Sequence, residues 1–501
     1  MASAFCRGCL SRLPRASFLP PPPTVPRTTT TATAAAATAG FHTSAVHYAN
    51  PTKKSNSMDS GPKYRQAKSA KMKRKKPVER TRPPPIGERK ALRNRIVLGN
   101  PNALEPADMQ NLSVENMGDP RVRGTVVGLP VSMLEQLRSV HAFKKSQRWG
   151  LFRRPATFMR KEALEMGRLF EKISGEEHGK VVKKVITGKV GSGKSVFLTQ
   201  AMAMGFLKNW VVFTVPETQE LVNAHTGYAP LDDANPGLYV QNQATSQLLQ
   251  RTFKANEKVL SGLKVSQEHP ALKSLVKPGM TLAQLTGLGI KDQAVAWPVF
   301  QALWAELTST SAPRPPILVT VDGLSHWMQN SEYRTADFKP IHAHDLVFVR
   351  HFLSLLKPGA NGKSTLPNGG LLLYATSGSN SPRIYSFDVA LKQLEATTSG
   401  VNPKSPEFPQ ADAYQNPDLR VIEAFAAPQP TSDKEGKLEL QPLSGLTRED
   451  TVGYMEFWAK SGLIRQVINF QWVSQLWTKS SGGIIGELLR LGSRLRVPQR
   501  T

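Results

Sequence analysis

Short apolar runs of strand length alternate with helix-length segments through the middle of the chain. Four of these runs are predicted to be strands: one ending at Ile186-Thr187, and those at 210–215, 317–322 and 370–377. Continuous apolar runs of this length are typical of parallel strands buried on both faces, and such strands need long crossovers between them. The pattern therefore predicts an α/β domain over residues 176–400, with a parallel sheet flanked by helices.

Helical patterns dominate the segments on the N-terminal side of this sheet and within it. Residues 101–175 contain a helical pattern at 130–143 and are expected to form an extension packed on the core. Residues 240–308 are expected to be a largely helical insertion between the second and third strands.

A small helical domain is predicted at the C-terminal end, over residues 401–501. A stretch rich in Ser, Pro and Asn at 396–418 marks its boundary. Thr447 is the predicted N-cap of a helix whose first turn contains Glu449 and Asp450, which favour a helix N-terminus. Two further helices are predicted from periodic apolar positions, at 467–479 and 483–495. Three helices in this position resemble the lid of AAA+ ATPases.

Positive charge is concentrated at the N-terminus. The chain carries 65 Lys and Arg against 38 Asp and Glu, a net charge of +27, yet its first acidic residue is Asp59. Residues 1–48 are rich in Arg, Ser and Ala, which predicts a mitochondrial transit peptide with a processing region near 40–44. The alternative is a disordered N-terminus without a targeting signal. Both cysteines, Cys6 and Cys9, lie here, so the rest of the chain has no disulfide, Cys-ligated zinc, iron–sulfur cluster or cysteine nucleophile.

A second basic segment, residues 49–100, is predicted to be disordered alone and to bind RNA. Its candidate RNA-binding residues are Lys71, Lys73, Arg74, Lys75, Lys76, Arg80 and Arg82. A nuclear localisation signal and a solvated tail without a partner are the alternatives. The excess charge favours a polyanionic partner, and no apolar stretch approaches 18 residues, so no transmembrane helix is expected.

A complete G-x-x-x-x-G-K-[ST] motif follows the first predicted strand, at residues 188–195. Glycines at these positions let successive backbone N–H groups face phosphate oxygens, and the following helix directs its positive end at them. The candidate phosphate-binding residues are Gly188, Gly191, Ser192, Gly193, Lys194 and Ser195. A glycine-rich turn without a nucleotide is the alternative.

A carboxylate at the end of the third predicted strand completes the candidate site. Asp322 is in the Walker B position and is expected to hold Mg²⁺ together with the Ser195 hydroxyl. Thr376 and Ser377 end the fourth strand and are possible sensors of the nucleotide. Gly323 stands where AAA+ ATPases usually carry a catalytic glutamate, so no catalytic residue is assigned and at most slow hydrolysis is expected.

Two further features are interpreted as structural. His342, His344 and His351 flank Asp345, but on one helix they could not easily share a metal ion, so they are expected to form a solvated helix face. The eight tryptophans have apolar neighbours and are expected in the core.

The ordered set of motifs resembles the death-associated protein family of mitochondrial small-ribosomal-subunit components, in a fungal form. The resemblance covers roughly residues 115–495. It rests on residues 149–155, Arg160, 188–195, 210–212, 216–217, 221–223, Tyr228, Tyr239, 247–249, 315–322 and 370–379.

This resemblance implies a structural protein in the head of the small mitochondrial ribosomal subunit, within the matrix. It implies GTP or GDP with Mg²⁺ as cofactor, although the absence of N-K-x-D leaves ATP open. Gly193, Lys194 and Ser195 would contact phosphate, and Ser195 and Asp322 would hold Mg²⁺. The implied partners are small-subunit ribosomal RNA, other mitoribosomal proteins and the large subunit.

Two other readings compete with this one. A matrix AAA+-type ATPase that cycles and oligomerises is disfavoured by Gly323 and by the long basic tail. A nucleoid-associated DNA-binding protein would explain the charge but not the ordered motifs.

Overall fold

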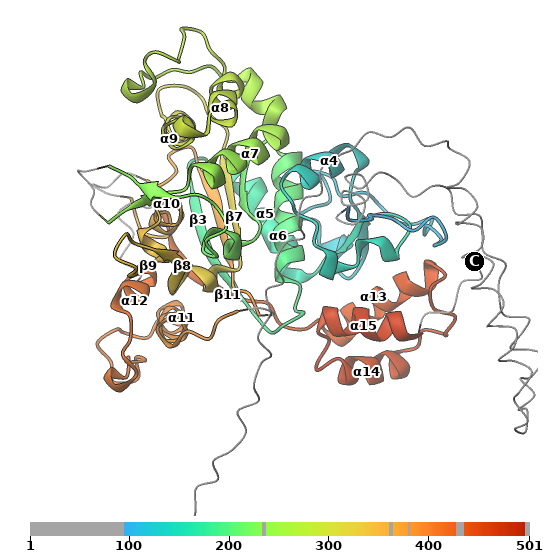
Figure 1. The fold of residues 1–501 in the computed structure, drawn as a ribbon. Helices are drawn as coiled ribbons and strands as arrows, with labels where there is room; N and C mark the ends of the chain where they lie inside the picture. The colour runs from blue at the N-terminus through green and yellow to red at the C-terminus, as the bar shows by residue number, and fades with distance from the viewer. Residues whose placement is uncertain (1–94, 233–236, 360–363, 379–380, 427–434, 496–501) are drawn as a thin grey trace, which may run out of the picture. The chain divides into compact units, whose positions relative to one another are not determined.

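A five-stranded parallel sheet lies at the centre of the computed structural model (Figure 1). Its strands are β3 (Val181–Thr187), β4 (Val211–Val215), β7 (Ile317–Asp322), β10 (Gly370–Ala375) and β11 (Glu435–Pro442). They are arranged in the order β11-β3-β10-β7-β4. The four strands expected from the sequence are confirmed, and β11 is an addition that the apolar pattern did not predict.

The structure describes residues 95–232, 237–359, 364–378, 381–426 and 435–495. The expected transit peptide and the seven candidate RNA-binding residues lie outside these ranges: Lys71, Lys73, Arg74, Lys75, Lys76, Arg80 and Arg82. Within the described residues, no helix is both long enough and apolar enough to cross a bilayer.

The strand register brings the carboxyl ends of β3, β7 and β10 to one edge of the sheet. At the end of β10, Ala375 lies opposite both Ile186 of β3 and Asp322 of β7. Because all strands are parallel, the loop after β3, the Asp322 carboxylate and Thr376 emerge at the same edge. One strand, β10, separates the glycine-rich loop from the strand that carries Asp322.

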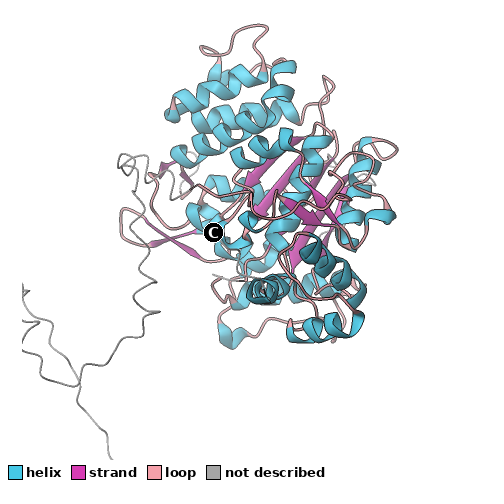
Figure 2. Ribbon diagram, turned by 90° about the vertical axis from the view of Figure 1, so that its right-hand side faces the viewer, coloured by secondary structure: helices cyan, strands magenta, loops and turns pink. Residues whose placement is uncertain are grey.

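Helices cover both faces of the sheet (Figure 2). Alternate residues of β4 face opposite ways: Val211 and Phe213 pack in one apolar cluster, and Val212 packs in the other. The first cluster includes side chains of α7 (Asn242–Gly262), α9 (Ala296–Leu307), α10 (Val347–Ser354) and α11 (Tyr385–Thr398). The second includes α4 (Val131–Ser139), α5 (Lys161–Ser174) and α6 (Lys194–Leu207). Burial on both faces explains why β4, β7 and β10 read as largely apolar runs, whereas β3 contains Lys183 and Lys184.

The N-terminal part of the described chain packs on the core. Most buried apolar residues from Leu98 to Ile173 belong to the same cluster as α6, whereas Ala103, Leu151 and Phe158 pack with the C-terminal helices. Two short strands, β1 (Val126–Gly128) and β2 (Ala156–Phe158), pair antiparallel in this part. The expected helix at 130–143 is α4.

The segment between β4 and β7 is largely helical, as the sequence predicts. It contains a short hairpin of β5 (Ala229–Pro230) and β6 (Tyr239–Val240), followed by α7, α8 (Leu282–Lys291) and α9. After β7 comes a second hairpin of β8 (Asn330–Arg334) and β9 (Pro340–His342).

The C-terminal part contributes both to the sheet and to a separate helical cluster. Helix α12 (Leu419–Phe425) packs against α11 and precedes β11, so the sheet extends beyond the boundary expected at residue 400. Three helices follow, α13 (Arg448–Lys460), α14 (Phe470–Lys479) and α15 (Ile485–Leu495), and they lie together (Figure 1). The Thr447 hydroxyl accepts a hydrogen bond from the Asp450 N–H at 3.1 Å, which confirms the predicted N-cap.

The expectation of a solvated histidine face is wrong. His342 ends β9 and is 3% exposed, His344 lies in a 3₁₀ turn, and His351 lies on α10. Burial lowers the pKa of His351 to about 4, and burial together with His342 lowers the pKa of His344 to about 3. The ring of His351 meets the edges of Phe300 and Trp304, so this residue fills core space as a neutral aromatic ring. The three histidines do not share one helix face, because the chain forms a strand, a 3₁₀ turn and a helix here.

Candidate functional site

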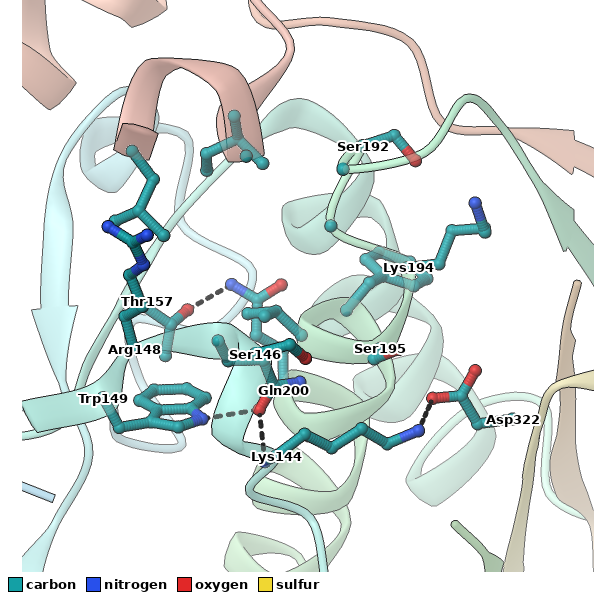
Figure 3. A pocket seen from close by; sticks show the side chains of 18 of the residues that line it. Lys144, Ser146, Arg148, Trp149, Thr157, Ser192, Lys194, Ser195, Gln200 and Asp322 are labelled. Atoms are coloured by element: carbon teal, nitrogen blue, oxygen red, sulfur yellow. Dashed lines mark hydrogen bonds and ion pairs between the residues drawn. The ribbon is translucent and has the colours of Figure 1, made fainter. Parts of the chain in front are cut away.

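A cavity of about 700 Å³ opens at the edge of the sheet where β3, β7 and β10 end. Its volume lies within the range of small-molecule and cofactor sites. The glycine-rich loop and the start of α6 form one wall, and Asp322, Thr376 and Ser377 form another. Residues 144–160 and the helices α13 and α15 close the remaining sides (Figure 3). Of the predicted nucleotide-site residues, all except Gly188 line this cavity.

The glycine-rich loop adopts a backbone that only glycine tolerates well. Gly188, Gly191 and Gly193 have φ values of +142°, +81° and +95°. A Cβ atom on Gly188 would also lie 2.5 Å from the carbonyl oxygen of Leu443. Helix α6 begins directly after Gly193, so its free N–H groups and its positive dipole end face the cavity. This is the geometry that holds a phosphate group.

Lys194 and Ser192 are buried polar residues of this loop. The Lys194 side chain is folded back, with Nζ donating to the carbonyls of Gly188 at 2.7 Å and Lys189 at 3.2 Å. Burial lowers the pKa of Lys194, and the Asp322 carboxylate opposes that shift. The Ser192 hydroxyl is buried and has no hydrogen-bond partner among the described residues. Both groups would gain from an anion in the loop.

The Asp322 carboxylate is already paired with a cation. Lys144 Nζ lies 2.6 Å from Asp322 Oδ2, and the two side chains are 23% and 10% exposed. Figure 3 shows the Lys144 side chain reaching Asp322, with Ser195 close by. No motif or periodicity in the sequence points to this lysine, because its place depends on how residues 140–149 fold over α6.

The two candidate sensors differ in their surroundings. Thr376 is buried and its hydroxyl donates to the carbonyl of Ile186 at 3.3 Å, a contact that ties the ends of β10 and β3 together. Ser377 is partly exposed and lines the cavity. Ser377 is therefore better placed than Thr376 to meet a ligand.

Arg160 connects three parts of the site. Its guanidinium donates to the carbonyl of Ser192 at 3.1 Å and to the carbonyl of Ser444 at 2.9 Å. The Glu162 carboxylate accepts two further hydrogen bonds from it, which holds the guanidinium plane in position. Arg160 is thus a positioning residue for the loop.

Aromatic side chains line much of the cavity. Trp149, Phe152, Phe158, Tyr454 and Phe457 contribute to its walls. They belong to the segment before α5 and to α13, two parts of the chain that sequence reasoning did not connect. Trp149 is buried as expected, but it also borders the cavity.

Helix α15 contacts the glycine-rich loop directly. The N–H of Gly486 donates to the carbonyl of Gly191 at 2.9 Å, and Ile485, Leu489 and Arg490 line the cavity. A Cβ atom on Gly486 would lie 2.9 Å from both the Cα and the oxygen of Gly191. Glycine at this position therefore lets the helix approach the loop.

Gly486→Ala is expected to push α15 away from the loop. The change should destabilise the chain by about 1–3 kcal/mol, as overpacked contacts do, and weaken ligand binding in the cavity. Thermal unfolding and nucleotide titration measure the two effects. Gly287→Ala in α8 is the matched control, because a Cβ atom there meets nothing within 4 Å. A Gly486→Ala chain as stable as the control would contradict the argument.

The residues fit a polyphosphate well. The loop offers backbone N–H groups, a buried unpartnered hydroxyl and a buried ammonium group. Ser195 and Asp322 both line the cavity and supply the oxygen donors that Mg²⁺ prefers. A metal ion at Asp322 would have to share the carboxylate with Lys144.

Comparison with known proteins agrees with the earlier resemblance. The family model described as "Mitochondrial ribosomal death-associated protein 3" matches residues 157–491. A Neurospora crassa protein named "Small ribosomal subunit protein mS29" is 38% identical over 421 residues, which cover 84% of this chain and 85% of that protein. The chain therefore belongs to the mitochondrial ribosomal death-associated protein 3 family.

Proposed function

We propose that this chain is a structural component of the small mitochondrial ribosomal subunit that binds a guanine nucleotide and ribosomal RNA. Its family places it in the mitochondrial ribosome, within the matrix. Its similar protein from Neurospora crassa carries the name of a small-subunit protein. In this role the chain supports mitochondrial translation beside ribosomal RNA, other mitoribosomal proteins and the large subunit.

The observation that carries nucleotide binding is the loop at residues 188–195. Its three glycines with positive φ and the start of α6 form a phosphate cradle at the sheet edge. The strand order supports the same conclusion, because one strand separates the loop strand from the Asp322 strand, as in AAA+-like P-loop NTPases. Helices α13 to α15 then stand in the position of a lid, with Gly486 against the loop.

Each polar residue has a defined task in this proposal. Backbone N–H groups of the loop and Lys194 Nζ bind the phosphates of GTP or GDP. Ser195 and Asp322 hold Mg²⁺, which neutralises phosphate charge when bound. Arg160 keeps the loop in place. The nucleotide then stabilises the arrangement of sheet, loop and C-terminal helices, because a ligand that binds only the folded state adds to its stability.

Purified small subunits test the nucleotide directly. Denaturing them and separating the released nucleotides should yield guanine nucleotide in about equal amount to this chain. Release of adenine nucleotide instead would assign ATP or ADP to the cavity, and release of none from intact particles would refute nucleotide binding.

Hydrolysis is expected to be slow. Gly323 has φ +95°, and a Cβ atom there would lie 2.7 Å from the Thr218 hydroxyl, so the position does not accept a catalytic glutamate without rearrangement. Glu217 also lines the cavity and is exposed. Phosphate release by the purified chain should therefore stay near the rate without protein. Rapid release that is lost in Glu217→Gln would contradict the prediction and identify the base.

RNA binding by the basic extension is expected to depend steeply on salt. Seven candidate cations that each neutralise a phosphate would lower the affinity for single-stranded RNA by roughly 10³-fold between 50 and 200 mM salt. Replacing Lys71, Lys73, Arg74, Lys75, Lys76, Arg80 and Arg82 by Gln in the full chain should flatten this dependence. Equal slopes for the two chains, measured by filter binding, would show that another surface anchors the RNA.

A matrix AAA+-type ATPase that cycles and oligomerises is the second candidate, favoured by the strand order and the C-terminal helices. Sedimentation of a matrix lysate separates the two. Migration with the small subunit at moderate salt supports the structural role, and a soluble hexamer with ATP turnover supports the ATPase.

A further inference from the structure

We propose that Lys144 is a built-in cation for Asp322, so that nucleotide binding in this cavity depends only weakly on Mg²⁺. The inference rests on the proposed nucleotide site and assigns a role to a residue outside its motifs. Lys144 is a positioning residue that neutralises the Walker B carboxylate from within the same chain.

Lys144 and Asp322 form a close ion pair. Lys144 Nζ and Asp322 Oδ2 are 2.6 Å apart, and both side chains are largely shielded from water. A short, partly buried pair is weakened less by solvent and salt than a surface pair. The carboxylate therefore carries little uncompensated negative charge toward the cavity.

The backbone around Lys144 is held in place on both sides. The carbonyl of Ala142 accepts a hydrogen bond from Thr199 of α6 at 3.1 Å, and Phe143 packs edge-on against Trp149. On the other side, the N–H of Lys144 donates to Gln147 Oε1 at 2.8 Å. Anchoring the backbone lowers the entropy that is lost when the long side chain settles against Asp322.

A nucleotide in this cavity would meet the charges of Lys144, Lys194 and Asp322. The Asp322 carboxylate is near enough to Lys194 to oppose the effect of burial on the pKa of that lysine, so it lies beside the phosphate cradle. A bare carboxylate there would repel a polyphosphate, and Mg²⁺ normally removes that repulsion. An ammonium group has three N–H donors. Lys144 can give one to Asp322 and still offer others to a phosphate oxygen.

The test measures the affinity of the purified full-length chain for GDP, with Mg²⁺ and with EDTA. The wild-type affinity is expected to fall less than about 3-fold on removing Mg²⁺, whereas Lys144→Ala is expected to lose about 10-fold or more in EDTA and to recover with Mg²⁺. Lys145→Ala is the control, since Lys145 is exposed, borders the same cavity and has the same charge. It is expected to respond to Mg²⁺ as the wild type does.

Two further variants separate charge from shape. Lys144→Arg retains a cation and is expected to remain insensitive to EDTA, whereas Lys144→Gln lacks the charge and is expected to behave like Lys144→Ala. Equal loss of GDP affinity in EDTA for the wild type and Lys144→Gln would overturn the proposal.

Thermal unfolding without nucleotide tests the role of Lys144 independently of nucleotide binding. Mg²⁺ alone is expected to raise the thermal midpoint of Lys144→Ala by about 2 °C or more, because the ion replaces the missing cation at Asp322, and to leave the wild type unchanged. If the wild type binds no GDP under any condition, the proposed nucleotide-binding function is refuted. The effect of Mg²⁺ on thermal unfolding then tests the role of Lys144 by itself. Identical responses of the wild type and Lys144→Ala to Mg²⁺ would then refute the role of Lys144.

Discussion

Replacing Lys194 by alanine is expected to weaken GDP and GTP binding by about 100-fold or more, which corresponds to about 3 kcal/mol. The lysine is 8% exposed, and its Nζ is held by the carbonyls of Gly188 and Lys189. Its burial lowers its pKa, so an adjacent phosphate would restore the preference for the charged form. Truncation removes this buried cation from the cradle and leaves the glycine-rich backbone to bind the phosphates alone.

Titration of nucleotide into the purified chain, or retention of nucleotide during gel filtration, measures this loss. Lys189→Ala is the matched control, because that side chain belongs to the same loop but is exposed. It should bind within about 2-fold of the wild type, as an exposed charge contributes little. Equal affinities for Lys194→Ala and the wild type would mean that the loop is not the phosphate site.

Glu306→Ala is expected to cost about 3–5 kcal/mol of folding stability, because it leaves a buried arginine without its partner. Glu306 lies in the last turn of α9 with 0% exposure, and Arg314, whose side chain is 2% exposed, lies 2.6 Å from its carboxylate. The same carboxylate accepts hydrogen bonds from the backbone N–H groups of Ser266 and Gln267. One side chain therefore ties the end of α9, the loop after α7 and the entry to β7 together.

Urea unfolding of the two chains measures the loss. Glu257→Ala on the exposed face of α7 is the control and should stay within about 0.5 kcal/mol of the wild type. Glu306→Ala combined with Arg314→Met should recover part of the stability, since no lone charge remains buried. A Glu306→Ala chain that unfolds with the control would contradict the assigned role.

The contribution of the Glu306 carboxylate to folding stability is expected to depend on pH. Burial raises the pKa of Glu306, but hydrogen bonds from Gln267, Ser266 and His269 outweigh burial and hold the pKa below its ordinary value of 4.5. The contribution of Glu306 is therefore complete above pH 4.5 and is lost as the pH falls through the lowered value. The stability difference between the wild type and Glu306→Ala should shrink below that pH.

The elements that the sequence predicted correctly share one property: their signal is local. Strands β4, β7 and β10, which are buried on both faces, appear as largely apolar runs, and the N-cap at Thr447 needs only residues within one turn. The helices at 467–479 and 483–495 were found from the spacing of their apolar residues, and α14 and α15 confirm them. The glycines of the loop were informative because their motif fixes the backbone by itself.

Strand β11 shows why a local signal can be missing. It pairs on one side only, with β3, and its residues alternate between exposed and covered, with Lys437 and Glu439 exposed beside the buried Leu438. An edge strand of this kind contains charged residues and lacks an apolar run. Only its pairing with β3 makes it part of the sheet.

The sequence by itself determined four of the five sheet strands, the glycine-rich loop, the acidic end of the third strand and the basic N-terminus. These follow from apolar periodicity, backbone freedom and charge, which act between neighbours in the chain. The tertiary structure alone decided that Lys144 meets Asp322 across 178 residues and that Gly486 of α15 rests on Gly191. Such contacts depend on how whole layers pack, because the position of a side chain in space is set by every element beneath it.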